Sequence, residues 1–339
     1  MAEICSNRIG KTSAEVTNIG FGGAGIGNLY TKVEDASATS CIQASYESGI
    51  RYFDTAPLYG HGLSEHRIGS ALRERERSSF TLSTKVGRML RPTRAEAVDS
   101  SLFPSCLPFV PFFDYSYDAV ARSIEDSLQR LGFDRIDIVL IHDVELSTHG
   151  SQVETDRRFR EAMDGGYLVL EKLRAEGVIK AIGCGVNEWQ ACERFAKAGD
   201  FDCFLLAGRY TLLEHEALDS FLPLCVERNV SIVIGGPFNT GILATGPVDG
   251  AYYNYVPAPP DILERVRRIQ KICEAHATPL PAAALQFPLH HPAIASVIPG
   301  SRSAEEVARN IRTFTVNIPD ALWADLKSEG LLRRDAPTP

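Results

Sequence analysis

The 339-residue sequence contains no run of about 18 apolar residues, the length needed for a membrane-spanning helix. Its first residues, MAEICSNRIGKTSAEV, lack the basic segment followed by an apolar one that marks a secretory signal. No long run of Lys or Arg is present and the net charge is −8, which argues against a nucleic-acid-binding surface. The sequence therefore favours a cytoplasmic protein that binds neither membranes nor nucleic acids.

The chain also lacks any Cys-x-x-Cys pair. Its eight cysteines are scattered, at Cys5, Cys41, Cys106, Cys184, Cys192, Cys203, Cys225 and Cys273. Several lie inside apolar runs, so we predict buried free thiols in a reducing compartment rather than a disulfide framework. The adjacent His290 and His291 have no partner cluster at metal-ligand spacing, so no metal site is predicted.

Short apolar runs alternate with amphipathic segments along the whole length. Eight runs have the character of strands: TNIGFGGAG, IRYFDTA, FTLSTKVG, IDIVLIHD, AIGCGV, FDCFLLAG, VSIVIGG and IASVIPG. Most are continuously apolar, as expected for parallel strands buried on both faces. Helical spacing is clear between them, for example in YDAVARSIEDSLQRLG, which stops at Gly132. We predict a single (β/α)8 TIM-barrel domain over residues 1–339.

Three connections are long, at residues 88–117, 144–158 and 239–260. Long loops are usually functional, and loops that follow barrel strands lie on the catalytic face. The first residues, ICSNRIGKTSAEVTNIG, indicate a short hairpin that turns at Gly10 and Lys11. We expect this hairpin to plug the amino-terminal end of the barrel.

Three ionisable residues stand at the ends of successive strands: Asp54 in YFDTA, Lys85 in STKVG and His142 in VLIHD. Tyr59 follows Asp54 on the next loop. Because parallel strands deliver their last residues to one rim, we expect the four side chains to meet. Each alone has a plainer explanation, such as a turn carboxylate or a buried structural histidine, but the four together indicate a catalytic site.

The chemistry of these four residues suits proton exchange at a carbonyl or an alcohol. A tyrosine hydroxyl has an ordinary pKa of about 10, and a nearby ammonium favours its phenolate. We expect Lys85 to lower the pKa of Tyr59, Asp54 to keep Lys85 charged, and neutral His142 to supply a hydrogen bond to the substrate oxygen. Tyr59 is the predicted acid or base.

This constellation resembles the aldo-keto reductase family, and the resemblance covers essentially the whole chain. GIRYFDTAPLYGHGLSEHRIGSAL is similar to the family's first signature, STKVG to its lysine strand and LGFDRIDIVLIHD to its histidine strand. LRAEGVIKAIGCGVN and VIPGSRSAEEVARNI are similar to its two cofactor segments. The resemblance implies an NAD(P)-dependent oxidoreductase with a nicotinamide cofactor across the barrel mouth and the catalytic tetrad Asp54, Tyr59, Lys85 and His142.

The glycine-rich GFGGAGIG is a poor Rossmann fingerprint, because no helix opens within it and the acidic partner is missing. The resemblance instead places Gly22, Gly23 and Ala24 beneath the nicotinamide and ribose, where larger side chains would crowd the approach. It also assigns the nicotinamide carboxamide to Asn187. The alternative for Asn187 is a helix N-cap ahead of EWQACERFAKAG.

One departure from the family pattern follows the seventh strand. Many members carry a tyrosine there that stacks on the nicotinamide, whereas this sequence has Gly235 and Gly236. Stacking would then come from elsewhere. The resemblance assigns the next five residues to the pyrophosphate: Pro237, Phe238, Asn239, Thr240 and Gly241.

The segment IPGSRSAEEVARN bears on the choice between NAD and NADP. NADP-selective members carry Lys in place of Gly300 and Arg in place of Glu306, and a carboxylate repels a 2′-phosphate. Arg302 would instead attract a 2′-phosphate, and the helix that begins near Ser303 offers its amino terminus to an anion. We expect NAD, with NADP as the alternative. The resemblance adds two further cofactor contacts, Ser301 and Asn310.

LYGHGLSE and GCGVNEWQ…LLAGRYTLLEH are most similar to the aldose-oxidising branch, which converts cyclic hemiacetals of the L-fucose, L-galactose or D-threo-aldose type to lactones. Pyridoxal oxidation, NADPH-dependent aldehyde reduction and a cofactor-binding regulatory subunit are the alternatives. The expected partner is a small sugar or aldehyde, and the sequence does not predict the oligomeric state.

Four aromatic residues of the 88–117 segment would form a lid, accept a pyridine ring or pack on the barrel: Phe103, Phe109, Phe112 and Phe113.

Overall fold

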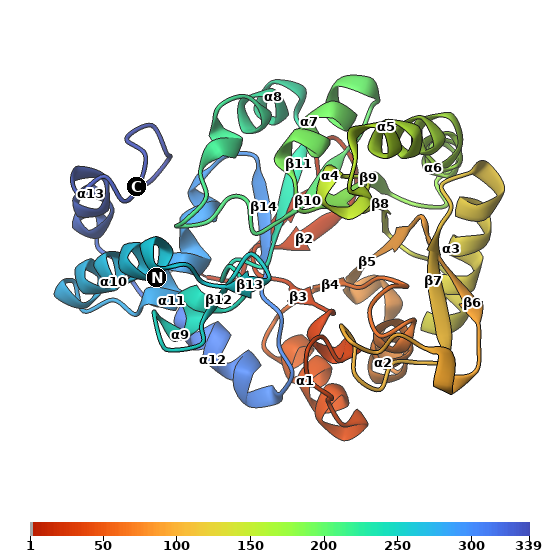
Figure 1. The fold of residues 1–339 in the computed structure, drawn as a ribbon, viewed down its shortest axis with the longest axis horizontal. Coiled ribbons are helices and arrows are strands. Elements are labelled where there is room, and N and C mark those ends of the chain that lie inside the picture. Colours follow the sequence, from red (N-terminus) through yellow and green to blue (C-terminus); the bar gives the residue numbers. More distant parts are fainter. Residues whose placement is uncertain (1–2) are drawn as a thin grey trace.

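Eight parallel strands form the centre of the computed structural model, which describes residues 3–339 (Figure 1). Their order around the sheet is β3-β4-β5-β8-β9-β10-β11-β14. Parallel bridges from Ile19 to Val297 and from Gly22 to Gly300 join the last strand to the first. The sheet therefore closes into a (β/α)8 barrel, which confirms the predicted fold.

Each barrel strand coincides with one of the eight apolar runs of the sequence. The strands are β3 (Phe21–Gly22), β4 (Tyr52–Asp54), β5 (Thr81–Val86), β8 (Ile138–His142), β9 (Ala181–Val186), β10 (Cys203–Ala207), β11 (Ser231–Gly235) and β14 (Ile294–Ile298).

Helices follow the strands and surround the barrel (Figure 1). The longer ones are α1 (Asp35–Glu47), α2 (Leu63–Leu72), α3 (Tyr117–Leu131), α5 (Gln152–Glu161), α6 (Tyr167–Ala175), α7 (Trp189–Ala198), α8 (Phe221–Arg228), α10 (Pro260–Ala275), α12 (Ala304–Phe314) and α13 (Asp320–Ser328). The shorter ones are α4 (Leu146–His149), α9 (Ile242–Thr245) and α11 (Leu280–Gln286). Gly132 ends α3 in the left-handed conformation, as predicted.

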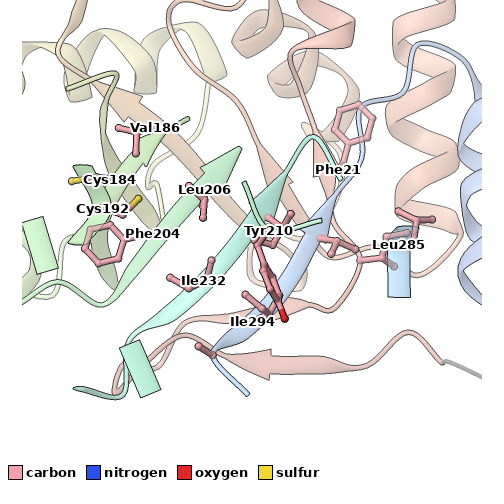
Figure 2. Close-up of a cluster of buried hydrophobic side chains, with 14 of the residues drawn as sticks. Phe21, Cys184, Val186, Cys192, Phe204, Leu206, Tyr210, Ile232, Leu285 and Ile294 are labelled. Atoms are coloured by element: carbon pink, nitrogen blue, oxygen red, sulfur yellow. The ribbon is translucent and has the colours of Figure 1, made fainter. Parts of the chain in front are cut away.

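Side chains along the strands alternate between the inside of the barrel and the layer beneath the helices. Leu206, Ile232 and Ile294, from neighbouring strands, belong to the outer layer (Figure 2). Leu140 and Leu205 belong to a separate cluster that fills the interior. Because the period is two, residues two positions apart on a strand face the same side.

The amino-terminal hairpin closes one end of this interior, as the sequence predicted. Strand β1 (Ser6–Arg8) pairs antiparallel with β2 (Glu15–Thr17). Ile9, Ala14 and Val16 are buried in the same cluster as the inward-facing barrel residues.

The three long connections contain regular structure that the sequence did not reveal. Residues 88–117 include an antiparallel pair, β6 (Arg88–Pro92) and β7 (Phe109–Phe113). Residues 144–158 contain α4 and the start of α5, and residues 239–260 contain α9 and the pair β12 (Tyr252–Tyr253) and β13 (Val256–Pro257). The β12–β13 hairpin lies near the centre of the view in Figure 1.

Within residues 3–339, no helix is long and apolar enough to cross a membrane, and no group of three His, Cys, Asp or Glu could hold a metal ion. The cysteines are free thiols, and six are buried as predicted. Cys5 is exposed and Cys106 is partly exposed, so the prediction of burial was wrong for these two.

Candidate active site

Strand parity brings three of the predicted residues to one rim of the barrel. Tyr52 and Leu140 belong to the interior cluster, and Asp54 and His142 stand two residues after them on the same strands. Lys85 reaches Asp54 from the neighbouring strand β5. All three functional groups therefore lie where the strands end.

The Asp54–Lys85 ion pair is almost fully buried. Lys85 Nζ donates to Asp54 Oδ2 at 2.7 Å and to the Thr55 carbonyl at 2.8 Å, while Ser83 Oγ donates to Asp54 Oδ1 at 2.7 Å. Burial by itself lowers the pKa of Lys85, but Asp54 and Tyr59 outweigh it and hold that pKa above its ordinary value. Lys85 is thus a charged ammonium at neutral pH.

Tyr59 lies over this ammonium, with Lys85 Nζ 4.7 Å from the centre of its ring. Burial raises the pKa of Tyr59 above its ordinary value, and Lys85 opposes this shift without cancelling it. The net direction is opposite to the sequence-based expectation, which considered the ammonium but not the desolvation of the hydroxyl.

His142 is buried beside Tyr59, with ring centres 6.0 Å apart. Burial lowers the pKa of His142 to about 3, so the imidazole is neutral, as expected. Its Nε2 lies 3.3 Å from Asp143 Oδ1, and Arg88 donates two hydrogen bonds to Asp143 Oδ2 at 2.7 and 2.9 Å. His142 Nδ1 is buried and has no hydrogen-bond partner among the described residues.

The 88–117 segment supplies an aromatic wall to this site. Phe103 is 3% exposed, and its ring centre lies 6.4 Å from that of Tyr59 and 6.3 Å from that of His61. Phe113 instead lies beneath Arg88, whose guanidinium carbon is 4.2 Å from the centre of the Phe113 ring. Phe109 is half-buried and Phe112 is exposed.

Asn187 is held at the mouth by two residues that the sequence did not single out. Its Nδ2 donates to Glu145 Oε1 at 2.7 Å, and its Oδ1 accepts from the Tyr255 hydroxyl at 3.0 Å. Glu188, not Asn187, is the N-cap of α7, so the N-cap alternative was wrong. No local pattern in the sequence marks Glu145 or Tyr255.

An open edge without side chains runs along the ends of β10, β11 and β14. A Cβ added at Gly300 would meet nothing within 4 Å. A Cβ added at Gly208 would have its nearest neighbouring atom at 3.6 Å, and one added at Gly236 would have it at 3.9 Å. The backbone is therefore open to an approaching ligand at these three glycines.

Gly22 and Gly23, at the end of β3, lack side chains for a different reason. A Cβ at Gly23 would come within 2.6 Å of the Asp54 carbonyl, and one at Gly22 within 3.1 Å of the Ile298 carbonyl. Strand packing by itself therefore excludes side chains there. Ala24 follows at the start of a 3-10 turn and is partly exposed.

Residues 237–241 form a tight turn at the end of β11. Asn239 is buried and uses its side chain within the protein, donating to the Gly208 carbonyl at 3.0 Å and accepting from the Thr211 hydroxyl. Thr240 Oγ1 accepts from the Tyr255 amide at 3.1 Å. The side chains of both residues are thus committed to protein partners. The other members of the turn are Pro237, Phe238 and Gly241.

The start of α12 is capped by two side-chain contacts. Ser303 Oγ accepts from the Glu306 amide at 3.3 Å, and Glu306 Oε2 accepts from the Arg302 amide at 2.8 Å. The Arg302 guanidinium also lies 3.4 Å from Glu306 Oε1. Arg302 and Glu306, which were expected to have opposite effects on a 2′-phosphate, are therefore paired with each other. Asn310 Nδ2 donates to Ser301 Oγ at 3.1 Å.

A recess of about 680 Å³ opens among the loops that follow β8, β9 and β10. Its walls carry both charges and an indole, from residues that include Glu145, Glu188, Trp189, Arg194, Arg209 and Glu214.

A buried ammonium beneath a tyrosine, beside a neutral histidine at a barrel mouth, suits an oxidoreductase that exchanges a proton at an alcohol or carbonyl. The chain matches the profile of the Aldo/keto reductase family over residues 18–329, and it belongs to that family.

Curated relatives are similar over nearly their whole length. The chain is 43% identical to pyridoxal 4-dehydrogenase from Microbacterium luteolum, over 96% of this chain and 97% of the relative. It is 39% identical to D-threo-aldose 1-dehydrogenase from a Pseudomonas species, over 95% of each. Identity to L-galactose dehydrogenase from Arabidopsis thaliana is 26%, over 93% and 89%. The chain is therefore an NAD(P)-dependent oxidoreductase.

Solved structures agree on the fold. The holo form of aldo-keto reductase AKR11C1 from Bacillus halodurans superposes with a TM-score of 0.76 at 23% identity, covering 98% of this chain and 97% of that one.

The mouth of this barrel fits the nicotinamide cofactor that the family uses. The open glycine edge leaves space for a dinucleotide, the amide of Asn187 faces the mouth, and the amino terminus of α12 lies beyond Gly300.

Proposed function

We propose that the protein oxidises the hydroxyl of a cyclic hemiacetal to a lactone with NAD, using Asp54, Tyr59, Lys85 and His142 as its catalytic residues. The observation that carries this proposal is the Asp54–Lys85 pair beneath Tyr59, next to neutral His142.

When bound, the cofactor would supply the acceptor for the hydride that leaves the hemiacetal carbon. Tyr59, as the phenolate, takes the hydroxyl proton, and the carbon–oxygen bond becomes the lactone carbonyl. Lys85 stabilises the phenolate electrostatically, and Asp54 keeps Lys85 charged and in place. Neutral His142 orients the substrate oxygen by a hydrogen bond.

The substrate that we favour is pyridoxal. Its aldehyde and neighbouring hydroxymethyl group close into an internal hemiacetal on a flat, aromatic ring. Phe103 and His61 form an aromatic wall against Tyr59, which suits such a ring better than a polyhydroxylated one. The 43% identical relative is named as a pyridoxal dehydrogenase, which supports the same choice.

An aldose is the second candidate. The polar recess beside Asn187 offers carboxylates, guanidinium groups and Trp189, and the 39% identical relative is named for a D-threo-aldose. Hydroxyl groups of a sugar find hydrogen-bond partners in such surroundings.

NAD is the cofactor that we propose. Glu306 lies at the start of α12 and pairs with Arg302, so less of the Arg302 charge is left for a 2′-phosphate. A cytoplasmic location is part of the same proposal.

The test is a substrate panel. NAD reduction is measured with pyridoxal, L-fucose and L-galactose, and aldehyde-dependent NADPH oxidation is measured in parallel. We expect pyridoxal to give the highest kcat/KM, with a lactone as product. A preference for NADPH and simple aldehydes, or a free acid formed without a lactone, would contradict the proposal.

A further inference from the structure

Glu145 is a buried carboxylate that the catalytic residues do not use. It follows β8 by three residues and is 0% exposed. Four groups donate to it: the Asn187 amide at 2.5 Å, Asn187 Nδ2 at 2.7 Å, the Glu188 amide at 2.9 Å and the Thr148 hydroxyl at 3.2 Å. Two of the four belong to Asn187, so Glu145 holds that residue by both its backbone and its side chain.

Glu188 makes a matching contact in the other direction. Glu188 reaches back to the segment that carries Glu145, and its carboxylate accepts from the Leu146 amide at 3.0 Å and the Ser147 amide at 2.8 Å. The loops that follow β8 and β9 are therefore fastened together by two carboxylates. Such a double contact holds Asn187 against rotation.

Glu145 also decides which way the Asn187 amide points. A carboxylate only accepts hydrogen bonds, so the NH2 group of Asn187 must face Glu145, and Oδ1 must face the other way. The Tyr255 hydroxyl donates to that oxygen at 3.0 Å from the β12–β13 hairpin. Asn187 is itself partly exposed, and a carbonyl oxygen has two lone pairs, so Oδ1 can accept from a second donor at the barrel mouth.

We propose that Glu145 is a positioning residue for the cofactor: it fixes Asn187 Oδ1 as the acceptor for an N–H of the nicotinamide carboxamide. This inference rests on the proposed function, in which Asn187 contacts that group.

The charge of Glu145 responds to pH near neutrality. Burial, followed by the like charge of Asp143, raises the pKa of Glu145 to about 7. Glu188 repels the carboxylate from the same side, while the Cys192 thiol and the Tyr255 hydroxyl also lie within electrostatic reach. Arg194 and Arg209 are the cations that line the adjoining recess.

The sign of the pH effect follows from the hydrogen bonds. Below the pKa of Glu145 its carboxyl gains a proton and loses acceptor capacity, so its four donors from Asn187, Glu188 and Thr148 are held less well. The amide of Asn187 is then less firmly oriented. Cofactor binding should strengthen as pH rises through about 7, because only the carboxylate holds Asn187 in place.

The experiment measures the Kd of NAD by calorimetry between about pH 6 and about pH 8.5, a range that brackets the pKa of Glu145. The same titrations use 3-acetylpyridine adenine dinucleotide, in which an acetyl group replaces the carboxamide and no N–H remains. We expect the Kd of NAD to rise by about fivefold at the acid end, the worth of one hydrogen bond. The acetyl analogue should show no such rise.

Two variants complete the test. In Glu145→Gln the NH2 group of the new side chain opposes the Asn187 donors, so NAD should bind about fivefold more weakly or worse, without pH dependence. The acetyl analogue should bind it as it binds the wild type. Glu188→Gln leaves the hydrogen bonds between Glu145 and the Asn187 side chain in place but removes a like charge that raises the pKa of Glu145. The contrast between the two dinucleotides should therefore remain, with the pH midpoint for NAD moved to lower pH.

The outcomes separate the two ideas. If wild-type protein binds neither dinucleotide, the proposed function fails. If NAD binds without pH dependence, or if the pH effect is the same for both dinucleotides, the role of Glu145 is refuted while the proposed function stands. The wild-type titrations decide this even if Glu145→Gln does not fold.

Discussion

Replacing Glu306 with glutamine should shift cofactor preference towards NADP. The Glu306 carboxylate accepts from the Arg302 amide and lies 3.4 Å from the Arg302 guanidinium, at the amino terminus of α12. The amide oxygen of glutamine can accept the same hydrogen bond from the Arg302 amide, so Glu306→Gln keeps the helix start intact. What the substitution removes is the negative charge.

The magnitude follows from screened charges at a half-exposed site. Two unit charges about 4 Å apart interact by about 1 kcal/mol in water, and a 2′-phosphate carries about two charges. Losing the repulsion from Glu306 is therefore worth about 1–2 kcal/mol. The released Arg302 side chain is 47% exposed, so it adds only a few tenths more. The NADP-to-NAD ratio of kcat/KM should rise by about 5- to 30-fold.

The assay compares this ratio in the wild type, Glu306→Gln and Glu305→Gln, at low and high salt. Glu305 is exposed in the same helical turn but makes no ion pair with Arg302, so it is the matched control. The effect should shrink at high salt, because exposed charges are screened. Equal ratios in both variants, or a wild type that already prefers NADP, would refute the reasoning.

Three further predictions concern the barrel mouth. Tyr59→Phe should lower kcat by about 10²–10⁴-fold while leaving the Kd of NAD within a few-fold, and a kcat within threefold of wild type would exclude Tyr59 as the acid or base. Lys85→Met should move the rising limb of the oxidation pH profile to higher pH. The phenolate is the reactive form, and Lys85 opposes the burial that raises the pKa of Tyr59; an unmoved limb would contradict this coupling. Gly185→Ala places a Cβ 3.2 Å from Lys85 Cε, so we expect both a loss of about 1–3 kcal/mol in stability, measured by denaturant unfolding, and a lower kcat; normal values of both would show that Lys85 shifts freely.

The fold could be predicted from the sequence alone, and so could the meeting of Asp54, Tyr59, Lys85 and His142 at one rim. Eight mostly apolar runs define buried parallel strands, and a run that carries Asp54, Lys85 or His142 at or near its end delivers that residue to the rim. The period of two then places Asp54 and His142 on the inside, because each lies two positions after an inward-facing residue, and Lys85 pairs with Asp54. These features are local or periodic, so they can be read from one sequence.

Only the tertiary structure decided the environment of these residues. The direction of the Tyr59 pKa shift depends on how much water the surrounding loops exclude, and the pairing of Arg302 with Glu306 depends on how α12 begins. Phe103 contacts Tyr59 from the loop of the β6–β7 hairpin, and no local sequence pattern predicted the register of that hairpin. Glu145 and Asn187 lie 42 residues apart in the chain and meet because β8 and β9 are neighbours in the sheet. Contacts between distant segments form only when the barrel closes, and the charge of a buried carboxylate such as Glu145 is set by those contacts.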